Sequence, residues 1–183
     1  MLQQFLNKLK QIDPNYTGKK YLLAVSGGVD SMAMIELFKQ SKLKFGICHC
    51  NFQLRADDSV LDEKLVTQSA KDSNVTLHSK SFDTEKVASE NKESIQITAR
   101  KLRYDWFDEL LDSHQYDFLV TAHHANDNLE TAIYKLAKGT GIKGVRGILP
   151  LQNKVLRPLL DFTKDELIKF VNNNDVQWRE DVS

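Results

Sequence analysis

The chain has 183 residues, of which 41% are apolar and 27% are charged, a composition typical of a soluble globular protein with one full-sized core. The 25 basic and 25 acidic side chains cancel, which argues against nucleic-acid binding through bulk positive charge but allows a local basic patch. The two cysteines, Cys48 and Cys50, exclude a disulfide framework, and no stretch of sequence approaches the length of a membrane span, so we expect a cytoplasmic protein.

Hydrophobic periodicity predicts helices and short buried strands along the whole chain. In chain order we expect a helix near 2–12, a strand at 20–25, a helix at about 30–40, a strand at 44–50, a helix at 57–73, a strand at 75–80, a helix at 94–111, a strand at 116–122 and helices at 126–138 and 161–174. Thr163 and Glu166 have capping-box spacing at the start of the last helix. On helix 126–138 we expect the apolar side chains to face inward, namely Leu129, Ala132, Ile133, Leu136 and Ala137.

Short apolar strands that alternate with amphipathic helices are typical of a parallel sheet covered on both faces. We therefore predict an α/β fold with a doubly wound, mostly parallel five-stranded sheet and helices on both faces, and a single domain over 1–183. Ligands of such sheets bind at the carboxyl ends of the strands. The stretches 26–31, 49–55 and 122–131 each follow a predicted strand, so we expect them to meet in one crevice.

The stretch Ser-Gly-Gly-Val-Asp-Ser at 26–31 lies between the first buried strand and a helix. Gly27 and Gly28 allow a sharp turn, and the helix that follows offers unpaired N–H groups to a phosphate. Asp30 would repel a phosphate unless a cation lay between them, and Mg²⁺ binds carboxylate and phosphate oxygens together. The simpler interpretation is a tight turn in which Asp30 caps the helix.

This stretch resembles the SGGxDS pyrophosphate loop of the N-type ATP pyrophosphatases, which have an adenine nucleotide alpha hydrolase-like (PP-loop) fold. Members of that superfamily split ATP between the α and β phosphates and leave an adenylated substrate. The resemblance implies that ATP and Mg²⁺ bind at this loop. The implied ATP-binding residues are Ser26, Gly27, Gly28, Val29, Asp30 and Ser31, with Asp30 also on the metal.

Further segments resemble those of tRNA(Ile)-lysidine synthetases, from about Lys20 to the end of the chain. They are HCNFQLR (49–55), TARKLRYDWF (98–107), TAHHANDNLET (121–131), GTGIKGVRGI (139–148) and RPLL (157–160). Phe52 stands in place of a second His of the family's segment, and Asn126 and Asn128 stand in place of Asp and Gln. The final WREDVS (178–183) resembles the start of the family's EDxSN segment. Because members of the family are much longer, with C-terminal tRNA-binding domains, we expect a catalytic piece of a longer protein.

The resemblance implies a ligase that adenylates the C2 oxygen of the wobble cytidine of tRNA(Ile) with a CAU anticodon. The amine of free L-lysine then displaces AMP and gives lysidine. Asp127 and Glu130 are the implied carboxylates for the lysine amine or the metal, Arg100 is the implied transition-state cation, and His49 is expected beside the nucleotide. The simpler interpretation is that Asp127 and Glu130 only favour a helix N-terminus, and that Arg103 only extends along a core edge.

One charge pattern is independent of the resemblance. No acidic residue occurs between Thr131 and Leu160, whereas six basic residues do: Lys135, Lys138, Lys143, Arg146, Lys154 and Arg157. Such a zone suits RNA phosphates, although scattered lysines are commonly only a solvated face.

Two other functions stay open, together with a homodimeric state. A tRNA thiolase of the same superfamily would adenylate a base and deliver sulfur, but such enzymes commonly use more cysteines than Cys48 and Cys50. A non-catalytic ATP-binding module would bind ATP and release no pyrophosphate. A zinc site built from these cysteines and His123 or His124 is disfavoured, because the spacing matches no common zinc pattern.

Overall fold

The computed structural model describes residues 1–54, 56–138 and 147–180. Its centre is a six-stranded sheet in the order β3-β2-β1-β4-β6-β5. The strands are β1 Lys20–Ala24, β2 Lys44–Asn51, β3 Leu77–Ser81, β4 Phe118–Val120, β5 Leu151–Gln152 and β6 Val155–Leu156. All pairs are parallel except β5 with β6. The predicted parallel α/β sheet is confirmed, but it has six strands where five were predicted. The four strands located from the sequence correspond to β1 to β4, and the hairpin strands β5 and β6 were not located because they are too short to show a period.

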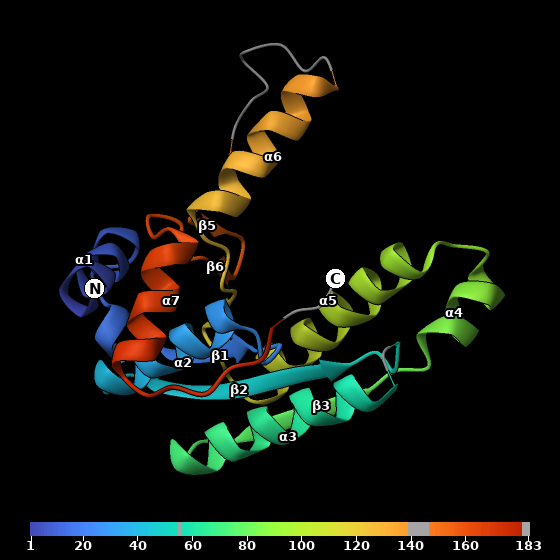
Figure 1. Cartoon of the computed structure of the whole chain (residues 1–183), viewed down its shortest axis with the longest axis horizontal. Helices are drawn as coiled ribbons and strands as arrows, with labels where there is room; N and C mark the ends of the chain where they lie inside the picture. Colours follow the sequence, from blue (N-terminus) through green and yellow to red (C-terminus); the bar gives the residue numbers. More distant parts are fainter. Residues whose placement is uncertain (55, 139–146, 181–183) are drawn as a thin grey trace.

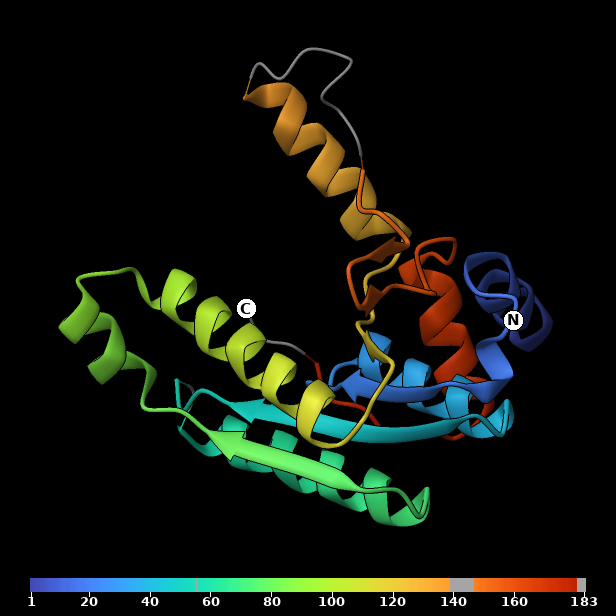
Figure 2. The ribbon, with the colours of Figure 1, turned by 180° about the vertical axis from the view of Figure 1, so that it is seen from behind.

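The helices surround this sheet in the order that the periodicity predicts. They are α1 Leu2–Ile12, the short 3₁₀ helix η1 Tyr16–Gly18, α2 Val29–Gln40, α3 Ala56–Asp72, α4 Thr84–Asn91, α5 Ile95–Ser113, α6 Ala125–Ala137 and α7 Lys164–Asn173. The capping box of Thr163 and Glu166 is present at α7. The sequence did not predict α4, which is only eight residues long and buries only Thr84 and Ala88. Figures 1 and 2 show α5 and α4 on the opposite side of the molecule from α1 and α7.

Alternate residues of β1 point to opposite faces of the sheet, and each face carries its own core. Tyr21 and Leu23 belong to the larger core, with α1, α2, α7 and part of α3. Leu22 belongs to the smaller core, where the aromatic rings of α5 cover the other face. Helices on both faces are the doubly wound arrangement that the alternation of elements predicts.

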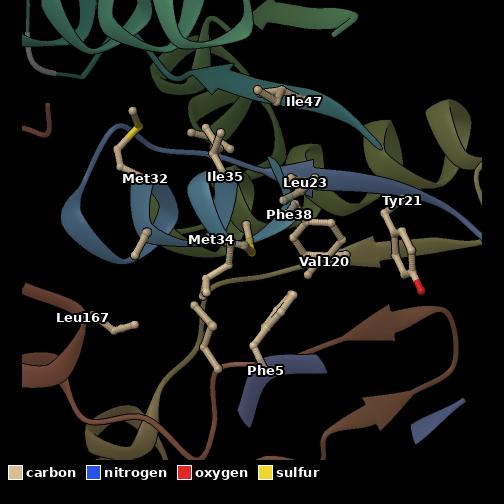
Figure 3. Packing of buried hydrophobic residues seen from close by; sticks show 14 of the residues in the cluster. Phe5, Tyr21, Leu23, Met32, Met34, Ile35, Phe38, Ile47, Val120 and Leu167 are labelled. Atoms are coloured by element: carbon tan, nitrogen blue, oxygen red, sulfur yellow. The ribbon is translucent and has the colours of Figure 1, made fainter. Parts of the chain in front are cut away.

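The larger core packs around Phe38 of α2, as Figure 3 shows. Its ring makes edge-to-face contacts with Phe5 and Tyr21, at centroid distances of 5.3 and 5.1 Å. Such pairs add about 0.5–1.5 kcal/mol each beyond the area they bury. This packing fixes α2 against β1 and therefore fixes the loop between them.

Helix α6 is the exception to the predicted packing. The prediction that its apolar side chains face inward is wrong, because none of its residues is buried and Leu129, Ile133 and Leu136 are 61%, 56% and 52% exposed. The physical reason is visible in Figure 1, where α6 leaves the sheet edge and projects away from the body. An amphipathic period shows that a helix has an apolar face, but not which surface covers it.

None of the helices within the described residues is both long and apolar enough to cross a membrane.

Gly46 of β2 offers a test of how tightly the smaller core is packed. A Cβ at Gly46 would overlap the hydroxyl of Tyr116, which also contacts Nε2 of His78 at 3.1 Å. Gly46→Ala should therefore lower the free energy of unfolding by about 1–3 kcal/mol, the usual cost of overpacking. Urea denaturation measures it. Gly18→Ala is the matched control, because nothing lies within 4 Å of that position. Equal stability of the two variants would contradict the packing described.

Candidate functional site

A cavity of about 770 Å³ opens at the carboxyl ends of β1, β2 and β4. Its lining comes from the three stretches that the sequence predicts to converge, and from α3 and α5: Ala24–Ser26, Asp30, Ser31, Cys48–Phe52, Leu54, Ser59, Asp62, Ile95, Gln96, Ala99, Arg100, Arg103, Tyr104, Phe107, Thr121–His123 and Asp127. The predicted convergence is thus confirmed for the described residues. Arg55, the last residue of the second stretch, lies outside them.

The loop between β1 and α2 contributes Ser26 to the cavity lining, and the start of α2 contributes Asp30 and Ser31, whereas Gly27, Gly28 and Val29 do not line it. Gly27 has φ +102°, a backbone conformation that a side chain would strain. The N–H of Gly27 donates to Oγ of Ser31 at 3.2 Å, and the N–H of Gly28 donates to Oγ of Ser26 at 3.2 Å. The helix has Gly28 as its N-cap without a side-chain cap, so the simpler interpretation of Asp30 as the capping residue is wrong. The glycine N–H groups thus bond the loop's own hydroxyls, and the loop leads into the N-terminus of α2, the end of a helix that favours an anion.

Asp30 places one carboxylate oxygen against cations and leaves the other unpaired. Its Oδ2 lies 3.5 Å from Nε2 of His124 and 3.8 Å from Nζ of Lys164. Its Oδ1 is buried and has no hydrogen-bond partner among the described residues. A buried unpaired carboxylate oxygen is costly, so it favours a ligand that binds it.

His124 connects Asp30 to Asp127. It is the N-cap of α6, and its backbone N–H donates to Oδ2 of Asp127 at 2.9 Å. Its ring Nδ1 lies 3.6 Å from the same oxygen. The hydrogen bond to Asp30 raises the pKa of His124 above its usual range, against the opposing effect of burial. Asp127 therefore caps a helix, as the simpler interpretation holds, and also lines the cavity.

Sequence reasoning missed His124 and Lys164 as site residues. The signal for His124 was its place before the helix, between a strand end and an aspartate. Nothing in the sequence places Lys164, because it reaches Asp30 from α7, far along the chain.

His49 and Asn51 brace the end of β2. His49 is 4% exposed and its Nδ1 lies 2.8 Å from the carbonyl oxygen of Val25, so Nδ1 carries the proton and donates. Asn51 donates to Glu63 of α3 at 3.0 Å and accepts from the N–H of Gln53. His49 therefore lies in the cavity wall beside the loop, where the sequence places it, and also fixes the strand just before Ser26.

Two arginines line the cavity from α5. The guanidinium of Arg100 lies 4.9 Å from the ring centre of Tyr104, and that of Arg103 lies 5.0 Å from the ring centre of Phe52. Because Arg103 lines the cavity as Arg100 does, it is more than a residue of the core edge. The part of the cavity lined by α5 therefore carries two cations.

The structure does not bring every predicted residue into the cavity. Glu130 is exposed on α6 and does not line it. The basic zone also divides: Lys154 pairs with Asp112 at 3.0 Å, and Arg157 is 9% exposed and donates to the carbonyl of Leu149. Lys143, Arg146, most of the glycine-rich segment 139–148 and the last residues of WREDVS lie outside the described residues.

The described residues hold no group of three or more His, Cys, Asp or Glu side chains that could by themselves bind a metal ion. A cation at Asp30 would need oxygens from a ligand to complete its shell, which is how Mg²⁺ usually binds with phosphates.

Comparisons with known proteins agree with this geometry. The chain is similar to the tRNA(Ile)-lysidine synthase of Chlorobaculum tepidum, with 40% identity over 98% of this chain and 55% of that protein. It is similar to the corresponding synthase of Bacteroides thetaiotaomicron, with 37% identity over 83% of this chain and 36% of that protein. The chain thus spans about half or less of the length of these curated relatives.

Among solved structures, a U34-tRNA thiolase from Methanococcus maripaludis with its [4Fe-4S] cluster superposes with a TM-score of 0.80 at 13% identity, over 100% of this chain and 67% of that one. An NH3-dependent NAD synthetase from Campylobacter jejuni superposes with a TM-score of 0.64 at 12% identity, over 95% and 71%. At these identities the likeness shows the fold alone. A model of the PP-loop domain family matches residues 1–183, and the chain therefore belongs to that family.

Proposed function

We propose that the chain carries the ATP-dependent chemistry of a tRNA(Ile)-lysidine synthase. In this reaction the C2 oxygen of the wobble cytidine attacks the α-phosphorus of ATP, and pyrophosphate leaves. The ε-amine of L-lysine then loses a proton, attacks C2 and expels AMP. The substrates are ATP, L-lysine and a tRNA(Ile) with a CAU anticodon, and we propose that the protein acts in the cytoplasm, where these substrates occur.

The observation that carries this proposal is the pairing of the loop 26–31 with the unpaired, buried Oδ1 of Asp30 in one cavity. The loop supplies donors for phosphate oxygens at a helix N-terminus. Arg100 and Arg103 line the same cavity as this loop, and there they would meet charge that develops on the phosphates. The similarity to lysidine synthases supports this substrate class over the other members of the fold.

The residues around Asp30 fit Mg²⁺. We assign Asp30 to the metal through its unpaired Oδ1, and we keep Asp127 as a second, water-mediated contact, since its Oδ2 is engaged by the cap of α6. When bound, the ion would neutralise charge between the carboxylate and the phosphates.

Sulfur chemistry is the less favoured alternative. Burial raises the pKa of the Cys50 thiol to about 12 and raises the pKa of the Cys48 thiol well above its usual range. Neither is therefore a ready thiolate, the form that sulfur transfer needs.

The direct test is release of pyrophosphate by the native protein. We expect pyrophosphate release from ATP to require tRNA(Ile). Formation of AMP, and therefore repeated turnover, should require lysine as well. Binding of ATP without pyrophosphate release would instead support a non-catalytic ATP-binding module. Formation of ADP would contradict cleavage between the α and β phosphates.

Asp30→Asn should reduce pyrophosphate release by about 100-fold or more, because an amide carries no charge for the cation. The fold should persist, since an amide is the same size as the carboxylate. Asp72→Asn, at the far end of α3, is the matched control and should keep full activity. Unchanged turnover in Asp30→Asn would reject the role in metal binding.

We propose that Glu130, on the exposed surface of α6 outside the cavity, binds the lysine amine. Glu130→Gln should then raise the KM for lysine by about tenfold and the KM for ATP much less, because a charged amine loses a charge-assisted hydrogen bond. Steady-state kinetics with each substrate varied in turn measures both constants. Glu90→Gln, on the exposed surface of α4, is the control. An effect on the KM for ATP alone would contradict the assignment.

We also propose a homodimer that forms through α6. Leu129, Ile133 and Leu136 recur at the spacing of a helix interface, and all three are more than half exposed. Leu129→Ser combined with Ile133→Ser should convert the dimer to a monomer in light scattering after size exclusion. Lys138→Ser, at the end of the same helix, should leave the dimer intact. A wild-type protein that stays monomeric at high concentration would contradict the proposed homodimer.

A further inference from the structure

The chain returns to the phosphate loop at Arg179, near the end of the described residues. Its backbone N–H donates to the carbonyl oxygen of Gly27 at 3.1 Å, and Arg179 pairs with Gly28 as a parallel bridge. This contact is made on the very residue whose φ of +102° shapes the turn. The loop is thus held by a third segment, in addition to β1 and α2.

The side chain of Arg179 extends the contact to α3. Its Nε donates to Oδ1 of Asp62 and its Nη2 donates to Oδ1 of Asp58, each at 2.8 Å. Asp62 also packs directly on the loop, because a Cβ added at Gly27 would lie 3.5 Å from Cβ of Asp62. Arg179 therefore joins α3 and the loop through both its backbone and its guanidinium.

The charge on Asp62 gives this contact a second consequence. Asp62 lines the same cavity as Ser26, Asp30 and Ser31, so its negative charge lies beside the space in which phosphates would lie. An unpaired carboxylate there would repel a triphosphate. The side chains of Arg179 and Asp62 are 33% and 22% exposed. Solvent therefore screens their charges only partly, and the ion pair with Arg179 offsets the negative charge of Asp62.

We propose that Arg179 is a positioning residue for the phosphate site. Its backbone N–H holds the loop at Gly27 and its guanidinium neutralises Asp62, so that the cavity accepts a polyphosphate. This inference rests on the proposed function only in that the loop binds ATP. It adds Arg179 to the phosphate site, and it adds the neutralisation of Asp62, neither of which belongs to the motif 26–31. A residue that only fastened the end of the chain would affect all ligands of the cavity alike.

The test compares the dissociation constants of α,β-methylene ATP and of adenosine by titration calorimetry, at constant Mg²⁺. The variants are Arg179→Gln, Asp62→Asn and the two combined. Adenosine lacks phosphates and is the internal control for the shape of the cavity. In wild type the analogue should bind more tightly than adenosine; equal affinities would reject the phosphate site, and with it both proposals.

Arg179→Gln should raise the dissociation constant of α,β-methylene ATP by about tenfold and leave that of adenosine unchanged, because only the phosphates meet the unneutralised charge of Asp62. The double variant should recover most of that loss, since it removes the charge that Arg179 neutralises. A double variant as weak as Arg179→Gln would overturn the proposal, as would equal losses for adenosine and the analogue, or no loss at all.

Asp62→Asn alone keeps the proposal testable if Arg179→Gln does not fold. It removes a negative charge from the cavity and leaves Arg179 bonded to Asp58. We therefore expect it to bind the analogue several-fold more tightly than wild type. Weaker binding would overturn the proposal.

Discussion

The site depends on how the negative charge of the Asp30 carboxylate is balanced. A carboxylate in the first turn of α2 stands at the same helix end that would receive phosphates, so its charge must be balanced. One oxygen is balanced by His124 and Lys164, whereas the other is buried and unpaired within the described residues. The fold therefore holds a negative group with one unpaired oxygen at a helix N-terminus, which is why we propose a cation between this carboxylate and the phosphates.

The surrounding elements keep this arrangement in place from several sides. Phe38 fixes α2 against β1, and His49 holds the first residue after that strand through the carbonyl of Val25. His124 ties the start of α6 to the loop through Asp30. Arg179 supports the turn itself at Gly27. Because these contacts come from separate strand ends and helices, the surrounding elements position the loop in addition to its own hydrogen bonds.

The sequence predicts the parallel sheet, most helices and the convergence of three loops, because buried strands and helix stripes leave clear periods. It does not predict β5 and β6, which are two residues long, or the exposure of α6, because an apolar stripe does not reveal what covers it. The motif predicts Asp30 as a ligand-binding residue. The partners Lys164 and Arg179 could not be predicted, since both act through contacts more than 100 positions along the chain, which no local pattern records.

The most direct measurement is a crystal structure of the protein with α,β-methylene ATP and Mg²⁺. The account predicts that the β and γ phosphates lie over Gly27 and Gly28 at the start of α2, with the cation between them and Oδ1 of Asp30. Nucleotide bound at another edge of the sheet, or phosphates directed away from this loop, would contradict it.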